Sequence, residues 1–253
     1  MKFKKTALSG YYTDQYFKSR VNKQKTLRQA DPAIFQKVAQ FINLTGPVGD
    51  IGSGAGNFLK ACETRGIKAI GIEGCKAAVL WANKNSNNKT IRHDLTKKLP
   101  FKDNFFQLVQ SNSVVEHLKP AAADQVIAEA YRILRPQGLF VCSCPNYFDW
   151  AERFPEHINL YTPTRLRQAL KKHKFQIVYE HFSFNLSLLT PWERFKENVP
   201  TGKWRLMTKK NSRLINLILA PIWLPVRLIN KYILNWETLD IVAGECYFIG
   251  RKN

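Results

Sequence analysis

The sequence predicts an α/β fold in which helices cover both faces of a mostly parallel sheet. Short apolar runs alternate with helical segments of ten or more residues through the middle of the chain, which is the pattern of a parallel sheet. The first apolar run leads directly into the glycine-rich turn GDIGSGAG at residues 49–56, and a helical segment follows it. With 253 residues and 45% hydrophobic content, the chain is long enough for one large domain with a substantial core.

The predicted elements follow one another in the order that such a sheet requires. The first helix, over residues 31–42, begins with Asp31 as its N-cap and Pro32 at its first position, and its apolar residues share one face. Pro136 and Gly138 are expected to end the last helix of this series. Further helices are expected at 55–66, 75–86 and 122–134, and strands at 47–51, 67–74, 89–94, 105–113 and 138–144.

The chain is strongly basic, and its basic residues are concentrated in two segments. It has 39 Lys and Arg residues against 19 Asp and Glu, which gives a net charge of +20. Residues 1–30 hold eight basic residues and one acid, and residues 165–213 hold twelve and three. Nucleic acid, an anionic membrane surface or a phosphorylated substrate would each exploit this charge, although solubility alone also explains it.

The cysteines and the N-terminal residues indicate a reducing compartment. Five cysteines are an odd number and form no C-x-x-C pair, so the sequence suggests neither a disulfide framework nor a zinc knuckle. The opening MKFKKTALSGYY is basic but lacks the continuous apolar run of a secretory signal. We therefore expect the protein to be cytoplasmic.

The glycine-rich turn is suited to close approach by a ligand. Residues without a Cβ tolerate positive φ and leave room beside the backbone, and the helix that follows presents free N–H groups. The dinucleotide pattern G-x-G-x-x-G would need glycine at position 57, which is Asn57, and the phosphate-loop pattern is absent. The spacing is instead G-x-G-x-G, formed by Gly52, Gly54 and Gly56, with Asp50 two residues before the first glycine.

Acidic and polar residues follow the later strands at the same predicted edge of the sheet. Glu73 ends the second strand, where an acidic side chain can reach a ribose diol. Asp94 follows the third strand, where a carboxylate can accept a hydrogen bond from an exocyclic amine. The end of the fourth strand leads into a polar group formed by Ser111, Asn112, Ser113, Glu116 and His117. Together these residues indicate a nucleoside-containing ligand.

These motifs resemble those of the class I S-adenosylmethionine-dependent methyltransferases over roughly residues 31–185. The glycine loop is similar to the family's first motif, Glu73 to its ribose-binding acid, and RHDL at 92–95 to its adenine-contacting segment. The segments at 99–118 and 131–146 are similar to the fourth and fifth segments of the small-molecule, ubiquinone-type branch. The resemblance implies a Rossmann-like seven-stranded sheet in the order 3-2-1-4-5-7-6, with S-adenosylmethionine as cofactor and S-adenosylhomocysteine as product.

The resemblance also implies roles for individual residues of the cofactor pocket. Asp50 would organise the loop or meet the amino group of the cofactor, and Glu73 would bind the ribose hydroxyls. Without the other motifs, Glu73 would be interpreted as a solvated acid at the end of a strand. Asp94 is explained equally well as a turn residue. The methionine-binding loop would comprise Gly52, Ser53, Gly54 and Gly56. The adenine edge would be contacted by Asp94 with Leu95. The wall near the sulfonium would comprise Ser111, Asn112 and Ser113.

Two histidines are candidates for a general base. His117 and His157 both fall in loops where the acceptor is expected, and histidine titrates near neutral pH. A structural hydrogen-bonding role explains either one equally well. Glu116 and His117 also resemble the end of a motif in ubiquinone-type O-methyltransferases, in which an acid three residues before the Glu helps to hold a divalent metal. That position is Ser113 here, so we expect no metal site.

Two regions lie outside the shared core. Residues 1–30 are expected to form a helical lid over the cofactor, or a helix that only packs on the methyltransferase domain at 31–253. A predicted apolar, helical insertion at about 186–238 precedes the last strand, and its apolar stretch at 214–234 is too short and too interrupted to span a bilayer. This stretch is interpreted as a cap packed on its own domain, a segment that dips into lipid, or a surface for a substrate or a second copy.

The sequence therefore predicts a methyltransferase that acts on oxygen of a small-molecule or lipid-linked acceptor, with peripheral contact with an anionic membrane. An RNA methyltransferase is the alternative that the charge supports, although no N-P-P-[YF] or D-P-P motif follows the fourth strand and no RNA-binding module is recognisable. A non-catalytic regulator that binds S-adenosylmethionine is a third reading, because binding and chemistry use different residues.

Overall fold

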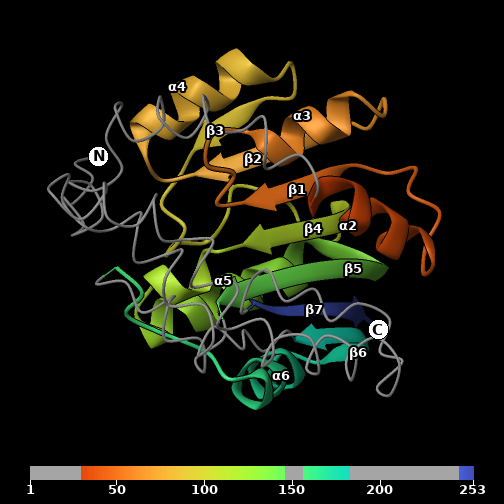
Figure 1. Cartoon of the computed structure of the whole chain (residues 1–253), viewed down its shortest axis with the longest axis vertical. Helices are drawn as coiled ribbons and strands as arrows, with labels where there is room; N and C mark the ends of the chain where they lie inside the picture. The colour runs from red at the N-terminus through yellow and green to blue at the C-terminus, as the bar shows by residue number, and fades with distance from the viewer. Residues whose placement is uncertain (1–29, 146–155, 183–244) are drawn as a thin grey trace, which may run out of the picture. The chain divides into compact units, whose positions relative to one another are not determined.

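The computed structural model describes residues 30–145, 156–182 and 245–253 (Figure 1). These residues form one seven-stranded sheet in the order β3-β2-β1-β4-β5-β7-β6, which confirms the predicted Rossmann-like topology. Pairing is parallel from β3 through β5, and β7 is antiparallel to both β5 and β6. The strands are β1 (Val48–Ile51), β2 (Ala69–Glu73), β3 (Thr90–Arg92), β4 (Phe106–Asn112), β5 (Leu134–Pro145), β6 (Phe175–Phe182) and β7 (Glu245–Lys252).

The helices pack on the sheet through two large groups of buried apolar side chains. One group joins the sheet to α2 and α3, through residues such as Val38 and Leu59, and the other joins it to α5 and α6, through Ile127 and Leu166. Helix α4 packs beside α3, with Ala78 against the glycine loop. The helices are α2 (Ala30–Ala39), α3 (Asn57–Glu63), α4 (Lys76–Asn85), the 3-10 helix η3 (Val115–His117), α5 (Pro120–Ile133) and α6 (Pro163–Lys172).

The boundary between α5 and β5 differs from the sequence prediction. We expected Pro136 and Gly138 to separate a helix from a strand, but β5 begins directly after Ile133, so both residues lie within the strand. Gln137 between them has a positive φ of 64°, and the pairing of β5 with β4 shifts register in this region. A local irregularity of this kind accommodates a proline, which cannot donate to the ladder.

Two expectations concern residues that the structure does not describe. The predicted lid at 1–30 lies outside the described residues except for its last position, and the insertion at about 186–238, with its apolar stretch at 214–234, lies wholly outside them. Within the three described ranges, we find no helix with the length and apolar character needed to cross a bilayer.

The topology brings the predicted site residues to one edge of the sheet. Parallel strands end at the same edge, so the loops that follow β1, β2, β3 and β4 all lie there. Asp50 pairs with Gly71 on one side and Gln110 on the other, which places the glycine loop between the ends of β2 and β4. The strand order changes direction at β1 and β4, and a ligand crevice is expected at such a point.

Candidate active site

The glycine loop adopts a left-handed backbone that leaves one position open. Gly52, Gly54 and Gly56 have φ values of 77°, 51° and 81°. A Cβ on Gly52 would lie 2.2 Å from Val114 Cγ2, and one on Gly56 would lie 2.9 Å from Ala82 Cα, so packing alone requires glycine at both positions. At Gly54 a Cβ would meet no atom of the described residues within 4 Å. Gly54 therefore faces open space, as a loop that receives a ligand requires.

Glu73 holds the glycine loop to the start of α4. One carboxylate oxygen, Oε2, accepts a hydrogen bond from the Gly54 N–H at 3.0 Å, and Oε1 accepts one from the Cys75 N–H at 2.8 Å. Burial raises the pKa of Glu73, and the hydrogen bonds from the backbone oppose that rise. The acid that the sequence assigned to the ribose therefore also organises the loop. Each oxygen retains a second lone pair that a ribose hydroxyl can use.

Asp50 and Ser53 are both buried parts of the loop framework. Asp50 lies in β1 and is 3% exposed, and Ser53 is 8% exposed. The Ser53 hydroxyl lies against β2, because a Cβ on Gly71 would come within 2.7 Å of Ser53 Oγ. The Ser53 N–H and the Gly52 N–H both point to the Ile72 carbonyl, at 3.3 and 2.7 Å. Backbone hydrogen bonds therefore hold the loop to β2, and the Ser53 hydroxyl makes no hydrogen bond within the described residues.

Asp94 forms a turn at the end of β3. Its Oδ1 accepts hydrogen bonds from the Thr96 N–H at 2.9 Å and the Thr96 hydroxyl at 2.7 Å. Burial raises the pKa of Asp94, but these hydrogen bonds outweigh it and the pKa lies below its ordinary value. Leu95 packs against the core beside it. Asp94 is therefore a turn residue, which was one of its two predicted roles. Its contact with the adenine of a cofactor stays a prediction.

The end of β4 is fastened to β5 through Asn112 and Ser113. Asn112 Oδ1 accepts hydrogen bonds from Ser143 Oγ at 2.7 Å and from Ser113 Oγ at 3.2 Å, and the Ser113 N–H donates to the Ser143 carbonyl at 2.9 Å. Ser113 has a φ of 53°, which turns the chain toward η3. Ser111 is 1% exposed and faces the core. Asn112 and Ser113 are exposed at the edge, where a wall near the sulfonium was predicted.

The two candidate bases lie together although they are distant in sequence. The rings of His117 and His157 meet edge to face, with centroids 4.8 Å apart. His117 Nδ1 lies 3.1 Å from the Glu156 carbonyl, and because a carbonyl only accepts, this nitrogen carries the proton. His117 Nε2 lies 3.9 Å from Oε1 of Glu116, whose side chain is fully buried. Burial lowers the pKa of His117, although its bond to the Glu156 carbonyl opposes this effect.

The residue that positions His157 is one that sequence reasoning missed. The Asn159 N–H donates to the Glu116 carbonyl at 3.0 Å, and Asn159 Nδ2 donates to the Val115 carbonyl at 3.2 Å. Arg165 in turn donates to Asn159 Oδ1 at 2.6 Å. These bonds fix the segment after β5 against η3. The sequence itself shows only an asparagine two residues after a candidate histidine. This asparagine can be recognised as an anchor only once the fold is known.

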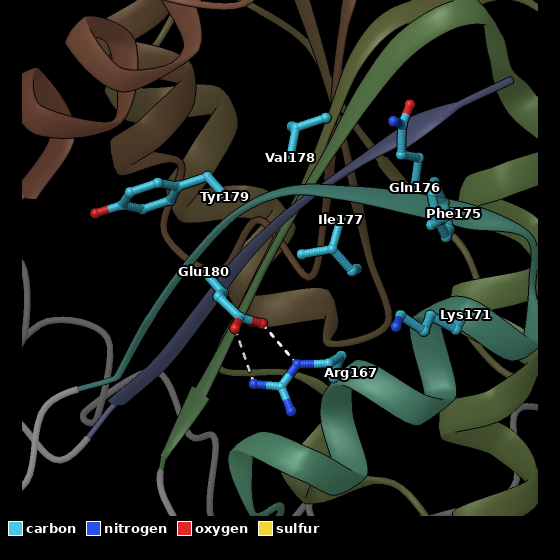
Figure 2. A pocket seen from close by; sticks show the side chains of 8 residues that line it. All are labelled: Arg167, Lys171, Phe175, Gln176, Ile177, Val178, Tyr179 and Glu180. Atoms are coloured by element: carbon cyan, nitrogen blue, oxygen red, sulfur yellow. Dashed lines mark hydrogen bonds and ion pairs between the residues drawn. The ribbon is translucent and has the colours of Figure 1, made fainter.

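A hollow of about 640 Å³ lies elsewhere on the sheet, along the edge strand β6 and helix α6 (Figure 2). Figure 2 shows Arg167 in a two-point ion pair with Glu180, at 2.7 and 2.9 Å. Arg167 and Glu180 therefore neutralise each other, and Lys171 adds a further positive charge to the lining of the hollow. β5 and β7 separate β6 from the glycine loop and the β4 end, and we assign the hollow no role in the predicted site.

Comparison with known proteins agrees with this geometry. Residues 49–142 match a family model described as a methyltransferase domain. The chain is 35% identical over 95 residues to a probable S-adenosylmethionine-dependent methyltransferase of Mycolicibacterium smegmatis, a match that covers 38% of this chain and 35% of that protein. It is 29% identical over 126 residues to phosphoethanolamine N-methyltransferase of Plasmodium falciparum, covering 46% and 47%. The chain thus spans less than half the length of these two relatives.

A solved structure shows the same fold over nearly the whole chain. The S-adenosylmethionine-dependent methyltransferase of Archaeoglobus fulgidus superposes with a TM-score of 0.60 at 20% identity, over 92% of this chain and 99% of that one. At this identity the likeness concerns the fold alone. Residues 49–142 match the methyltransferase domain model, and together with the strand order and the glycine loop these matches support a methyltransferase of the class I S-adenosylmethionine-dependent type.

Proposed function

We propose that the chain transfers a methyl group from S-adenosylmethionine to an oxygen of a small-molecule or lipid-linked acceptor. The open position at Gly54 beside the Glu73 carboxylate is the observation that supports S-adenosylmethionine as the cofactor. A nucleoside can approach a backbone without side chains there, and the carboxylate can receive its ribose hydroxyls. The nearby acids also suit a cationic ligand, since a sulfonium carries a positive charge.

The acceptor is proposed to bind near the end of β4. Bound S-adenosylmethionine would supply the methyl group, whose carbon leaves the sulfur as the new bond to the acceptor forms. The protein's contribution is to align the two reactants and to receive the proton of a hydroxyl acceptor. The cluster of His117 and His157 is proposed to serve the second task, because His117 follows Asn112 and Ser113 closely in the chain after β4 and its ring contacts that of His157.

The class of the acceptor is inferred from the charge of the chain and from one relative. The net charge of +20 supports an anionic partner, and we propose peripheral contact with an anionic membrane from the cytoplasmic side. The relative from Plasmodium falciparum is named as an N-methyltransferase of phosphoethanolamine, so nitrogen of a small polar acceptor is the second candidate. RNA is a further candidate that the charge alone supports.

Transfer of labelled methyl from S-adenosylmethionine tests this proposal. Separated lipid extract, small soluble metabolites and total RNA would each be offered as acceptor, and the labelled product would be hydrolysed to identify the methylated atom. We expect label in lipid or metabolites, bound to oxygen. Label on nitrogen would favour the second candidate, and label confined to RNA would replace the proposal with the RNA reading. Cofactor binding without any transfer would favour the non-catalytic regulator.

A further inference from the structure

The side chains after β4 and β5 bring three metal-ligating atoms together. One ligand atom from each of Glu116, His117 and His157 lies within 4.8 Å of the other two. Glu116 and His117 belong to η3, and His157 comes from the segment that follows β5. No other such group of three was found among the described residues. The Glu116 side chain is fully buried, so this group differs from a cluster of exposed acids.

The orientation of His117 suits a ligand. Its Nδ1–H donates to the Glu156 carbonyl, which leaves the lone pair of the neutral ring on Nε2. Metal-binding histidines are commonly oriented by such a bond from the other ring nitrogen. Nε2 is also the atom that lies 3.9 Å from Glu116 Oε1. This separation is too long for a hydrogen bond. Two ligand atoms at about 2.0 to 2.2 Å from one ion stand about 3.4 Å apart at a tetrahedral angle, so this pair would need to close by about half an ångström.

The third ligand is held in place without any ion. Asn159 donates its backbone N–H and its side-chain amide to the Glu116 and Val115 carbonyls, and Arg165 fixes the same asparagine. His157 therefore stands next to η3 because of the fold, two residues from this anchor. The ligand atoms of the three residues are up to 4.8 Å apart, and a rotation of the His157 side chain that closes this separation by about 1.4 Å would complete the set.

We propose that Glu116, His117 and His157 bind one divalent transition-metal ion of the zinc, cobalt or manganese type. Two imidazole nitrogens and one carboxylate favour such ions over magnesium or calcium, which prefer oxygen ligands throughout. Ser113 occupies the position at which the ubiquinone-type motif has a further acid. For this reason we expected no metal site from the sequence. In this chain the third ligand comes from another segment, so the donor set is different and richer in nitrogen.

The site would also refine the proposed methyl transfer, on which this part of the inference depends. Three protein ligands leave at least one position open, as in catalytic zinc sites. An acceptor hydroxyl bound there would have a lowered pKa, because a bound cation favours the deprotonated oxygen. Its proton would pass to solvent, its oxygen would form the bond to the methyl carbon, and the electron pair of the broken bond would stay on sulfur. The imidazoles would then act as ligands, in place of a base.

The test is a metal titration of the full chain without a polyhistidine tag. The protein is stripped with a chelator and titrated with Co²⁺, whose visible absorption reports histidine ligation, and with Zn²⁺ in competition. We expect saturation at one ion per chain. His157→Gln should weaken binding at least tenfold, whereas His93→Gln, at a histidine outside the cluster, should leave it unchanged. Glu116→Gln should act like His157→Gln where thermal melting shows that it is folded.

The outcomes separate this inference from the proposed function. The titration needs neither acceptor nor methyl transfer, so saturable binding that depends on His157 supports the metal site even where no transfer is found. Absence of saturable Co²⁺ absorption, or equal affinity in the His157→Gln and wild-type proteins, overturns it. Methyl transfer at full rate by chelator-treated protein would show that the ion, although bound, is not used in the reaction.

Discussion

Replacing Gly54 by alanine separates the role of this position in ligand approach from its role in folding. Gly54 has a φ of 51°, and within the part of the chain that the structure describes a Cβ there would meet nothing within 4 Å. Gly66, which follows α3 at the opposite edge of the sheet, has a φ of 68° and is equally open. The two positions therefore impose the same backbone demand on alanine. They differ in that only Gly54 borders the proposed cofactor.

The expected magnitudes follow from this match. Alanine in the left-handed region costs about 1 to 2 kcal/mol, and neither position adds a steric clash, so both variants should lose that much free energy of unfolding. For a domain of this size the loss corresponds to a melting temperature lower by about 2 to 8 °C. Only Gly54→Ala places a methyl group where the cofactor should lie. Its affinity for S-adenosylmethionine should fall at least tenfold, which is about 1.4 kcal/mol.

The assay combines thermal denaturation with calorimetric titration of S-adenosylmethionine on wild type, Gly54→Ala and Gly66→Ala. Equal melting temperatures of the two variants, with weakened binding in Gly54→Ala alone, would support the reasoning. Affinity for S-adenosylmethionine in Gly54→Ala within twofold of that in Gly66→Ala would refute the placement of the cofactor at this loop. A much larger loss of stability in Gly54→Ala would show that the position is not open.

Three further predictions concern other parts of the domain. Glu73→Gln should weaken S-adenosylmethionine binding at least tenfold, because an amide can accept only one of the two backbone hydrogen bonds; calorimetry with Glu180→Gln as control checks this, and equal affinities would count against it. Arg132→Leu should lower the free energy of unfolding by about 3 kcal/mol in urea denaturation, because it strips the buried Glu129 carboxylate of its partner. The double replacement of Arg132 and Glu129 by leucine should recover part of that loss, and no recovery would contradict the reasoning. Hydrogen bonds, the largest from the Lys60 side chain, lower the pKa of Glu63 from 4.5 to about 2, so its ionised form stabilises the fold above pH 4.5 and this contribution is lost as the pH falls toward 2. The difference in melting temperature between wild type and Glu63→Gln should therefore shrink over that range, and a constant difference would contradict it.

The sequence alone supported the sheet and the edge at which the site lies. Alternating apolar runs and helical segments predict parallel strands, and parallel strands end at the same edge, so Glu73 and Asp94 were correctly expected at the edge of the sheet that carries the glycine loop. The strand order came from the family resemblance, since pairing of β7 between β5 and β6 leaves no periodic signal. The α5–β5 boundary was wrong because Pro136 and Gly138 were expected to separate the helix from the strand, whereas β5 begins at Leu134 and accommodates both residues through a local irregularity.

The contacts within the site could not have been predicted in the same way. The bond between Gly54 and Glu73 spans 19 residues, and the contact between His117 and His157 about 40, so both depend on how separate elements pack. Residue type also leaves open which way a side chain points. Ser53 and Ser111 were expected to line the pocket, and both residues are buried, so their contact with a cofactor stays a prediction. Sequence patterns place a residue at an edge, whereas packing decides which group faces the ligand.

Equilibrium binding of S-adenosylmethionine to the wild-type chain and to Glu73→Ala tests the central claim most directly. The account predicts one S-adenosylmethionine per wild-type chain, displaced by S-adenosylhomocysteine, and loss of binding in Glu73→Ala while its thermal melting remains cooperative. Absence of saturable binding to the wild type would contradict the assignment of the cofactor to the glycine loop, and so would unchanged affinity in Glu73→Ala.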